Sequence, residues 1–215
     1  MSSTALAVSE KMPAHIKLAS SRGNENVGAN VQIPRIKLLQ MMNKETIKSS
    51  DKYVDGAEPG HFYNTLTQDL TDEVNVISVT VKTAWKVWQQ DRKGTLGEFP
   101  TREAAELAIT DTNTPHLYFS PEETDTHLLL IKDAETGALE PAIMDFSKTK
   151  LWVSRNWNST IGSKGGDRFA SMWKMGAQTV ENDKGTFFNL KMDWLGWTQK
   201  ADFEDAESLY MKHAV

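Results

Sequence analysis

The sequence predicts an α+β protein with an antiparallel, β-rich core and two to four short helices. Three observations predict this class: a long run of β-branched and aromatic residues at 74–88, two hairpin patterns later in the chain, and helical periodicity only in short segments. The core would form either an OB-like, partly open barrel or a curved sheet. A chain of 215 residues is long enough to bury a sizeable hydrophobic core.

Composition divides the chain into three segments. Residues 1–32 are rich in Ser, Ala, Asn and Gly without a sustained period, and we expect a disordered or extended N-terminal arm. Residues 33–200 are expected to form a single α+β domain. Residues 201–215 carry four acids and one lysine, which indicates an acidic C-terminal helix or tail. We find no signal peptide and no apolar run of membrane-spanning length, and expect no membrane association.

Four elements are expected in the first half of the domain. Residues 34–42 fit a short helix or an extended segment, and residues 61–67, between turn dipeptides, fit a strand. The run at 74–88 fits a long strand or one arm of a hairpin. Residues 101–110 show the clearest helical pattern, with Thr101 as N-cap.

The second half predicts two hairpins separated by a helix. Residues 128–132 and 141–146 would pair across a DAETG turn. Ser147 is the expected N-cap of the helix that follows. Residues 168–174 alternate strictly between two faces, and residues 186–194 return after an NDKG turn, so we expect two paired strands.

The stretch 148–174 is the most distinctive part of the sequence. It holds six Lys or Arg residues against Asp167, a net charge of +5, in a chain whose net charge is −5. Tryptophan and phenylalanine are interleaved with these cations. Cations that hold phosphates, alternating with rings on which bases stack, are typical of sequence-tolerant single-strand binding. The alternative is a core of aromatic residues with a solvated rim of cations.

The tryptophans of this stretch are not equally suited to stacking. A helical stripe of apolar residues favours Trp157 as a core residue, although it stays a candidate. Alternation places Trp173 on the face opposite Arg168 and Lys174, which weakens it as a stacking ring. Trp152 is therefore the preferred ring.

Two smaller basic clusters lie outside this stretch, around residues 82–88 and 35–37. The candidate DNA-binding residues are therefore fourteen Lys, Arg and Trp side chains: Arg35, Lys37, Lys82, Lys86, Trp88, Lys148, Lys150, Trp152, Arg155, Trp157, Lys164, Arg168, Trp173 and Lys174.

The sequence lacks the usual signatures of catalysis. The absence of Cys excludes thiolate metal sites and cysteine nucleophiles, and the Gly-rich segment 162–167 does not match a P-loop. Among the five His residues, His127 has an acid at ligand spacing, Asp125, and a surface loop is the favoured place for that pair. Glu122 and Glu123 are expected in the same solvated loop. We expect no enzymatic activity, no catalytic residue, no metal site and no cofactor.

Four short motifs, IPRIKLLQ (33–40), GHFYNTLT (60–67), SRNWNS (154–159) and KGTFFN (184–189), resemble bacteriophage single-stranded-DNA-binding proteins. The closest resemblance is to the early DNA-binding transcription regulators of N4-related phages. It implies non-enzymatic, largely sequence-independent binding of single-stranded DNA in phage replication and transcription regulation, in the host cytoplasm. It also implies a homo-oligomer.

Protein partners are the second expectation. The resemblance implies contacts with phage RNA polymerase or replication proteins through acidic regions. The alternative function is a structural or regulatory interaction factor, such as a virion component or a polymerase-binding protein. It would use the acidic segment 98–145, whose net charge is −9, or the C-terminal helix.

Overall fold

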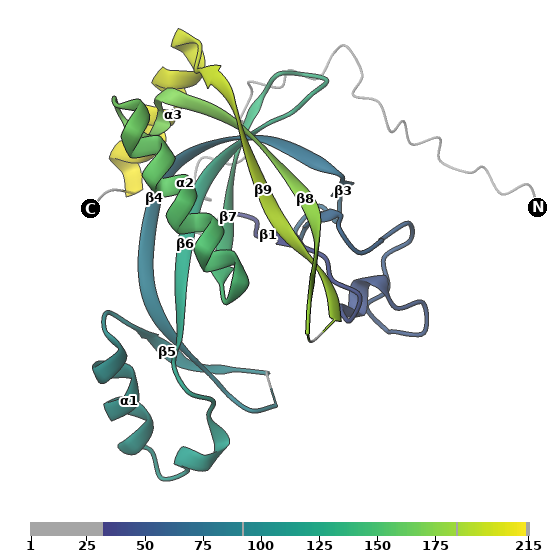
Figure 1. Ribbon diagram of the computed structural model, residues 1–215, viewed down its shortest axis with the longest axis vertical. Coiled ribbons are helices and arrows are strands. Elements are labelled where there is room, and N and C mark those ends of the chain that lie inside the picture. Colours follow the sequence, from purple (N-terminus) through teal and green to yellow (C-terminus); the bar gives the residue numbers. More distant parts are fainter. Residues whose placement is uncertain (1–31, 92, 184, 214–215) are drawn as a thin grey trace, which may run out of the picture. The chain divides into compact units, whose positions relative to one another are not determined.

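The structure is a computed structural model that describes residues 32–91, 93–183 and 185–213 (Figure 1). Apart from Gln32, the expected N-terminal arm of residues 1–32 lies outside these ranges. The described residues form nine strands and three α-helices: β1 Ile36–Leu38, β2 Phe62–Asn64, β3 Leu70–Thr71, β4 Glu73–Trp88, β5 Thr95–Phe99, α1 Arg102–Thr110, β6 Glu122–Lys132, β7 Leu139–Ser147, α2 Thr149–Lys164, β8 Ser171–Asn182, β9 Gly185–Trp197 and α3 Lys200–His213.

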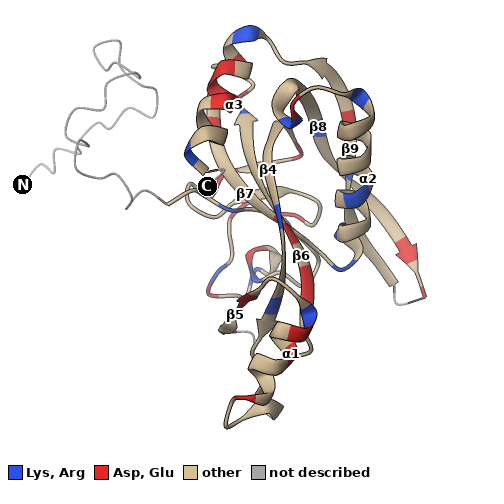
Figure 2. Ribbon diagram, turned by 90° about the vertical axis from the view of Figure 1, so that its left-hand side faces the viewer, with Lys and Arg blue, Asp and Glu red and all other residues tan. Residues whose placement is uncertain are grey.

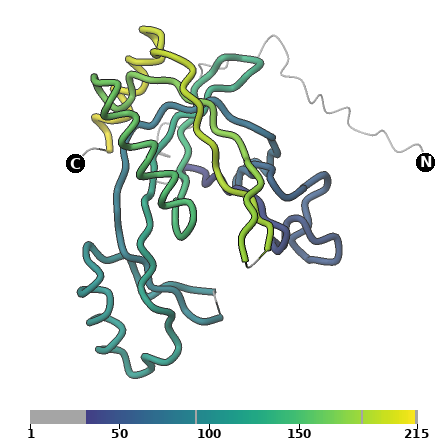
Figure 3. Tube along the Cα trace, viewed as in Figure 1, coloured from purple at the N-terminus to yellow at the C-terminus, as the bar shows by residue number. Residues whose placement is uncertain are grey.

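The main sheet is antiparallel and is built around the long strand β4. Its strand order is β7-β6-β4-β8-β9, with β5 paired to the far end of β4. β8 pairs with residues 73–77 of β4, β5 pairs with residues 85–88, and β6 runs beside most of the strand. The tube in Figure 3 follows this course from the β4–β6 pair to the β8–β9 hairpin. The sheet is curved and open, not a closed barrel, which confirms the predicted α+β class.

A smaller sheet, with strand order β1-β2-β3, connects the two edges of the main sheet. At one edge the Ile143 amide of β7 donates to the Pro34 carbonyl at 2.8 Å. At the other edge Gln40 donates to the Phe188 carbonyl at 2.9 Å and accepts from the Phe188 amide at 3.0 Å. The segment 34–40 therefore spans the opening between β7 and β9.

The sheet buries apolar side chains on both faces. On one face α2 contributes Trp157, which packs with Trp173 and Met175 of β8 in the larger core cluster. On the other face α3 contributes Ala206, which packs with Phe169 in a second cluster. Each fully buried large apolar side chain contributes roughly 1.5–3 kcal/mol to stability. Alternation along the strands explains how one sheet serves two cores.

Most of the predicted elements are present. β4 is one continuous strand, and both predicted hairpins are formed, by β6–β7 and by β8–β9. α1 begins after Thr101, whose hydroxyl accepts from the Ala104 amide at 3.2 Å. The acidic C-terminal helix is α3. Of the two alternatives for the segment 34–42, the extended one is found, with β1 at Ile36–Leu38 and a turn at residues 41–42. None of the described helices is long and apolar enough to cross a bilayer.

Three local predictions were wrong. Ser147 ends β7, and Lys148 takes the N-cap position of α2 without a side-chain cap. The strand expected from residue 168 begins at Ser171, because Arg168 lies in a 3₁₀ turn and its side chain bonds to Ser78 at 2.8 Å. The expected acidic loop at 122–125 is instead part of β6, where Asp125 is buried.

Candidate nucleic-acid interface

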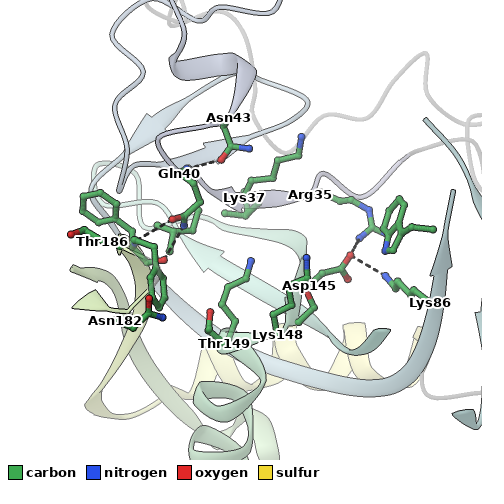
Figure 4. Close-up of a pocket in the computed structure, with 18 of the residues that line it drawn as sticks. Arg35, Lys37, Gln40, Asn43, Lys86, Asp145, Lys148, Thr149, Asn182 and Thr186 are labelled. Atoms are coloured by element: carbon green, nitrogen blue, oxygen red, sulfur yellow. Dashed lines mark hydrogen bonds and ion pairs between the residues drawn. The ribbon is translucent and has the colours of Figure 1, made fainter. Parts of the chain in front are cut away.

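A basic groove lies where α2 begins (Figure 4). Its volume is about 950 Å³. The walls come from four parts of the chain: the β1 segment, the far end of β4 with β5, the junction of β7 and α2, and the tip of the β8–β9 hairpin. Five cations line it, against the two carboxylates of Glu98 and Asp145, which leaves a net charge of +3: Arg35, Lys37, Lys86, Lys148 and Lys150.

The fold brings together three basic clusters that are far apart in the sequence. Lys86 of β4 pairs with Glu122 of β6, so the end of β4 lies near the β7–α2 junction. The bridge between Arg35 and Ile143 holds the start of β1 against β7. Six of the fourteen predicted residues therefore line one groove: Arg35, Lys37, Lys86, Trp88, Lys148 and Lys150.

Asp145 connects two of these cations. Its Oδ2 atom lies 2.8 Å from Nη1 of Arg35 and 3.0 Å from Nζ of Lys86, and its Oδ1 atom accepts from the Thr126 hydroxyl at 2.7 Å. Burial alone would raise the pKa of Asp145, but the hydrogen bonds from Thr126 and Lys86 and the two positive charges lower the pKa below its usual value. Asp145 is thus an anion held inside a cationic groove.

Lys150 differs from the other groove cations. Lys37 pairs with Glu45 at 3.4 Å, and Lys148 pairs with Glu122 at 3.4 Å. Within the part of the chain that the structure describes, the side chain of Lys150 has no ion pair or hydrogen bond. Desolvation lowers the pKa of Lys150, and the charge of Asp145 offsets part of this effect. A desolvated cation without a partner is costly, and a bound anion would remove that cost.

The first turn of α2 adds to the positive potential of the groove. The first amides of a helix lack intrahelical acceptors, and the helix dipole favours anions at this end. No side chain caps α2, and Thr149 and Lys150 of its first turn line the groove. Lys148, which precedes the helix, has φ 54° and ψ −122°, a conformation that favours glycine. Strain of this kind is found preferentially at functional sites.

The groove also contains aromatic surface. Trp88 and Phe187 are half-buried and line it, as does Phe188, whose backbone bonds to Gln40. Sequence reasoning missed Phe187 because its place depends on β9 packing against the β1 segment, about 150 residues earlier in the chain. The aromatic FF pair of the KGTFFN motif was the available signal.

Three predicted residues, Trp157, Trp173 and Arg168, are held by contacts within the fold and do not line the groove. Trp157 and Trp173 are each only 2% exposed, and their rings meet edge to face at 6.1 Å. Of the two roles left open for Trp157, the core role is confirmed. Arg168 donates to Ser78 and Asn158 within the fold, and desolvation lowers its pKa to about 10. These contacts engage the guanidinium of this half-buried residue within the fold.

The five remaining candidates lie outside the groove. Trp152 is 67% exposed on α2, one turn beyond the first residues of the helix. Arg155 forms two hydrogen bonds to Glu123 at 2.9 Å. The others contact acids or a ring: Lys82 lies 3.9 Å from Glu98 of the groove, Lys174 lies 3.2 Å from Glu73, and Lys164 lies over the ring of Trp194 at 3.6 Å.

His127 and Asp125, expected in a loop, are buried on β6 under α2. Nδ1 of His127 faces the Arg168 guanidinium at 3.5 Å, so it accepts, and Nε2 donates to the Ser154 hydroxyl at 2.8 Å. Ser154 in turn donates to Asp125 at 2.6 Å. Burial, followed by the charge of Arg168, lowers the pKa of His127 to about 3.

This arrangement differs from that of a nucleophilic triad. The serine lies between the acid and the histidine, and His127 donates to Ser154, so it cannot accept the proton of that hydroxyl. Ser154 and Asn158 of the SRNWNS motif thus stabilise the interior. Within the described ranges, no group of three or more His, Asp or Glu side chains is arranged to hold a metal ion.

The comparisons with known proteins add one finding. Neither a curated protein nor a solved structure matches this sequence. A family model described as Pam3 phage gp34-like protein matches residues 2–214. The match agrees with the phage origin that the sequence motifs imply. Because it covers almost all 215 residues, the chain belongs to the Pam3 phage gp34-like family of bacteriophage proteins.

Proposed function

We propose that this phage protein binds single-stranded DNA, without strong sequence preference, in the basic groove at the start of α2. The observation that carries the proposal is the convergence of five cations in a groove of net charge +3, among them Lys150, a half-buried lysine whose side chain has no hydrogen bond or ion pair within the described ranges. A phosphodiester is a natural partner for such a site, because its charge would pair with Lys150 and would lie at the N-terminus of α2, where the helix dipole favours an anion.

The other lining residues suit a single strand. Arg35, Lys37 and Lys148 line the groove with side chains that are about half exposed, so they would contact successive phosphates (Figure 4). Trp88 and Phe187 offer ring faces for bases, each stack contributing roughly 1–3 kcal/mol. No helix at the basic groove is placed to enter the major groove of duplex DNA. We therefore expect no base-specific readout of duplex DNA at this site. Such a protein would act in phage replication and transcription regulation, as the motif resemblance implies.

The test removes one cation from each side of the groove. We expect Lys37→Ala with Lys150→Ala to weaken oligo(dT) binding and to reduce the salt slope by about 1.4, because each lost phosphate contact accounts for about 0.7. The matched control, Lys200→Ala with Lys212→Ala, also removes two lysines, and neither lines the groove. Equal slopes for the two double variants would place the binding site elsewhere.

A further inference from the structure

An exposed pair of tryptophans, Trp194 and Trp197, lies near the end of β9. Trp194 is 40% exposed and Trp197 is 55% exposed, and their rings meet edge to face with centroids 5.9 Å apart. Neither lines the basic groove. Two large rings kept at the surface lose the stability that burial would give them, which points to a binding role.

An irregularity in the strand pairing places both rings together. Met172 pairs with Gly196 and Trp173 pairs with Trp194, so Leu195 is an extra residue in β9. In regular alternation, residues three apart would face opposite sides of the sheet. The bulge brings Trp197 back to the side of Trp194, and Gly196 accepts the φ of 142° that this needs.

The surroundings of the pair are cationic. Nζ of Lys164, the last residue of α2, lies 3.6 Å from the centroid of the Trp194 ring. α2 carries Lys150, Arg155 and Lys164 and no acid, and Figure 2 shows blue bands on this helix without red. Asp193 precedes the pair, but it is already bonded to Lys191 at 2.8 Å.

Helix α2 links the tryptophan pair to the basic groove. Its first turn lines the groove, and its last residue contacts Trp194. A helix of 16 residues is about 24 Å long, which corresponds to roughly seven nucleotides of a stacked strand at about 3.4 Å each. This span lies within the range of about 4–16 nucleotides that single-strand-binding domains cover.

We propose that Trp194 and Trp197 form a second base-stacking subsite for the same single strand, reached along α2 and assisted by Lys164. This inference rests on the proposed function of the groove. It deepens that function by defining where a longer strand continues after it leaves the groove. An aromatic pair with an adjacent cation is the combination that sequence-tolerant binders use, because every base presents a π-face.

The experiment compares two lengths of oligo(dT) on the wild type and on Trp194→Ala with Trp197→Ala. A strand of about three nucleotides is too short to leave the groove, whereas one of about 16 reaches the pair. We expect the double variant to bind the long strand at least tenfold more weakly and the short strand as the wild type does. Leu195→Ala, a neighbouring exposed apolar residue in the same strand, is the control and should change neither affinity.

Two results would overturn the inference. If the double variant binds both lengths as the wild type does, the pair makes no contact with DNA, and a protein partner is the better explanation for its exposure. If both lengths weaken equally, the substitutions act through the fold and not through a separate subsite. Wild-type protein that binds neither length would instead refute the proposed function of the groove, so the two failures are distinguishable.

Discussion

Nζ of Lys86 lies 3.0 Å from Oδ2 of Asp145, and the Lys86 side chain is only 6% exposed. Asp145 binds Arg35 through the same oxygen. An internal carboxylate therefore occupies a position that a phosphate oxygen would compete for.

We predict that Asp145→Asn strengthens binding of single-stranded DNA and weakens the fold. Removing one negative charge next to the phosphate site is worth about 1 kcal/mol even at high dielectric, or about fivefold in affinity at low salt. The loss of a partly buried partner for Lys86 should lower the free energy of unfolding by about 1–3 kcal/mol. Titration and denaturant unfolding measure the two effects. Asp205→Asn, an exposed change on α3, controls for net charge, and equal affinities for the two variants would contradict the prediction.

The second prediction concerns the stacking ring. Trp88 lines the groove, whereas Trp152, the ring that the sequence favoured, is exposed on α2 outside it. We expect Trp88→Ala to weaken binding of a short strand by roughly 1–3 kcal/mol and to remove part of the fluorescence quenching. Trp152→Ala should change the affinity of the short strand much less. The reverse order would mean that bases stack on the outer face of α2.

The third prediction uses the backbone of Lys148, whose φ is 54°. Lys148→Gly and Lys148→Ala remove the same charge, and both should weaken DNA binding to the same extent. Only glycine adopts this conformation without strain. The free energy of unfolding of the Gly variant should therefore be about 1 kcal/mol higher than that of the Ala variant. Thermal or denaturant unfolding provides the comparison. Equal stability of the two variants would show that the conformation carries no strain.

The fourth prediction follows from the low pKa of His127. Its pKa is about 3 in the folded protein, compared with the ordinary value of 6.5 that applies in the unfolded chain. Between pH 3 and pH 6.5 the unfolded chain therefore binds a proton that the folded chain does not. Stability from this group is complete above pH about 6.5 and decreases as the pH falls toward 3, by at most about 1.4 kcal/mol per unit.

His127→Gln isolates that contribution. The variant should be less stable at neutral pH, because it disturbs the bonds to Ser154 and Arg168. Its stability should nevertheless fall less steeply than that of the wild type between pH 6.5 and pH 3, since glutamine does not titrate. Unfolding curves at several pH values measure both slopes. If the stability of the variant and of the wild type fell with equal slopes, His127 would be protonated in the folded protein over this pH range, as it is in the unfolded chain.

The secondary structure was largely predictable from the sequence, because it depends on local patterns. The β-branched run at 74–88 and the cap at Thr101 act within a few residues, and both are found as predicted. The errors occurred where a distant contact overrides a local pattern. Arg168 fits a strand by alternation, but its bond to Ser78, 90 residues away, turns the chain there.

The candidate site was predictable in its residue types and not in its geometry. The lysines and arginines of three clusters were identified from charge alone, but their convergence depends on how β1, β4 and α2 meet. The burial of Trp157 and Trp173 follows from packing between α2 and β8. The tryptophan pair of β9 depends on a bulge at Leu195, for which the sequence carries no clear signal.

Titration of the wild-type protein with fluorescent single-stranded and duplex oligonucleotides, at about 50 and about 200 mM salt, tests the central claim most directly. The basic groove predicts preference for the single strand. Four phosphate contacts, from Arg35, Lys37, Lys148 and Lys150, would give a slope of about −2.8, and the affinity should fall about fiftyfold between the two salt concentrations. If neither oligonucleotide binds at the lower salt concentration, the groove does not hold DNA, and the acidic surface and a protein partner become the better account.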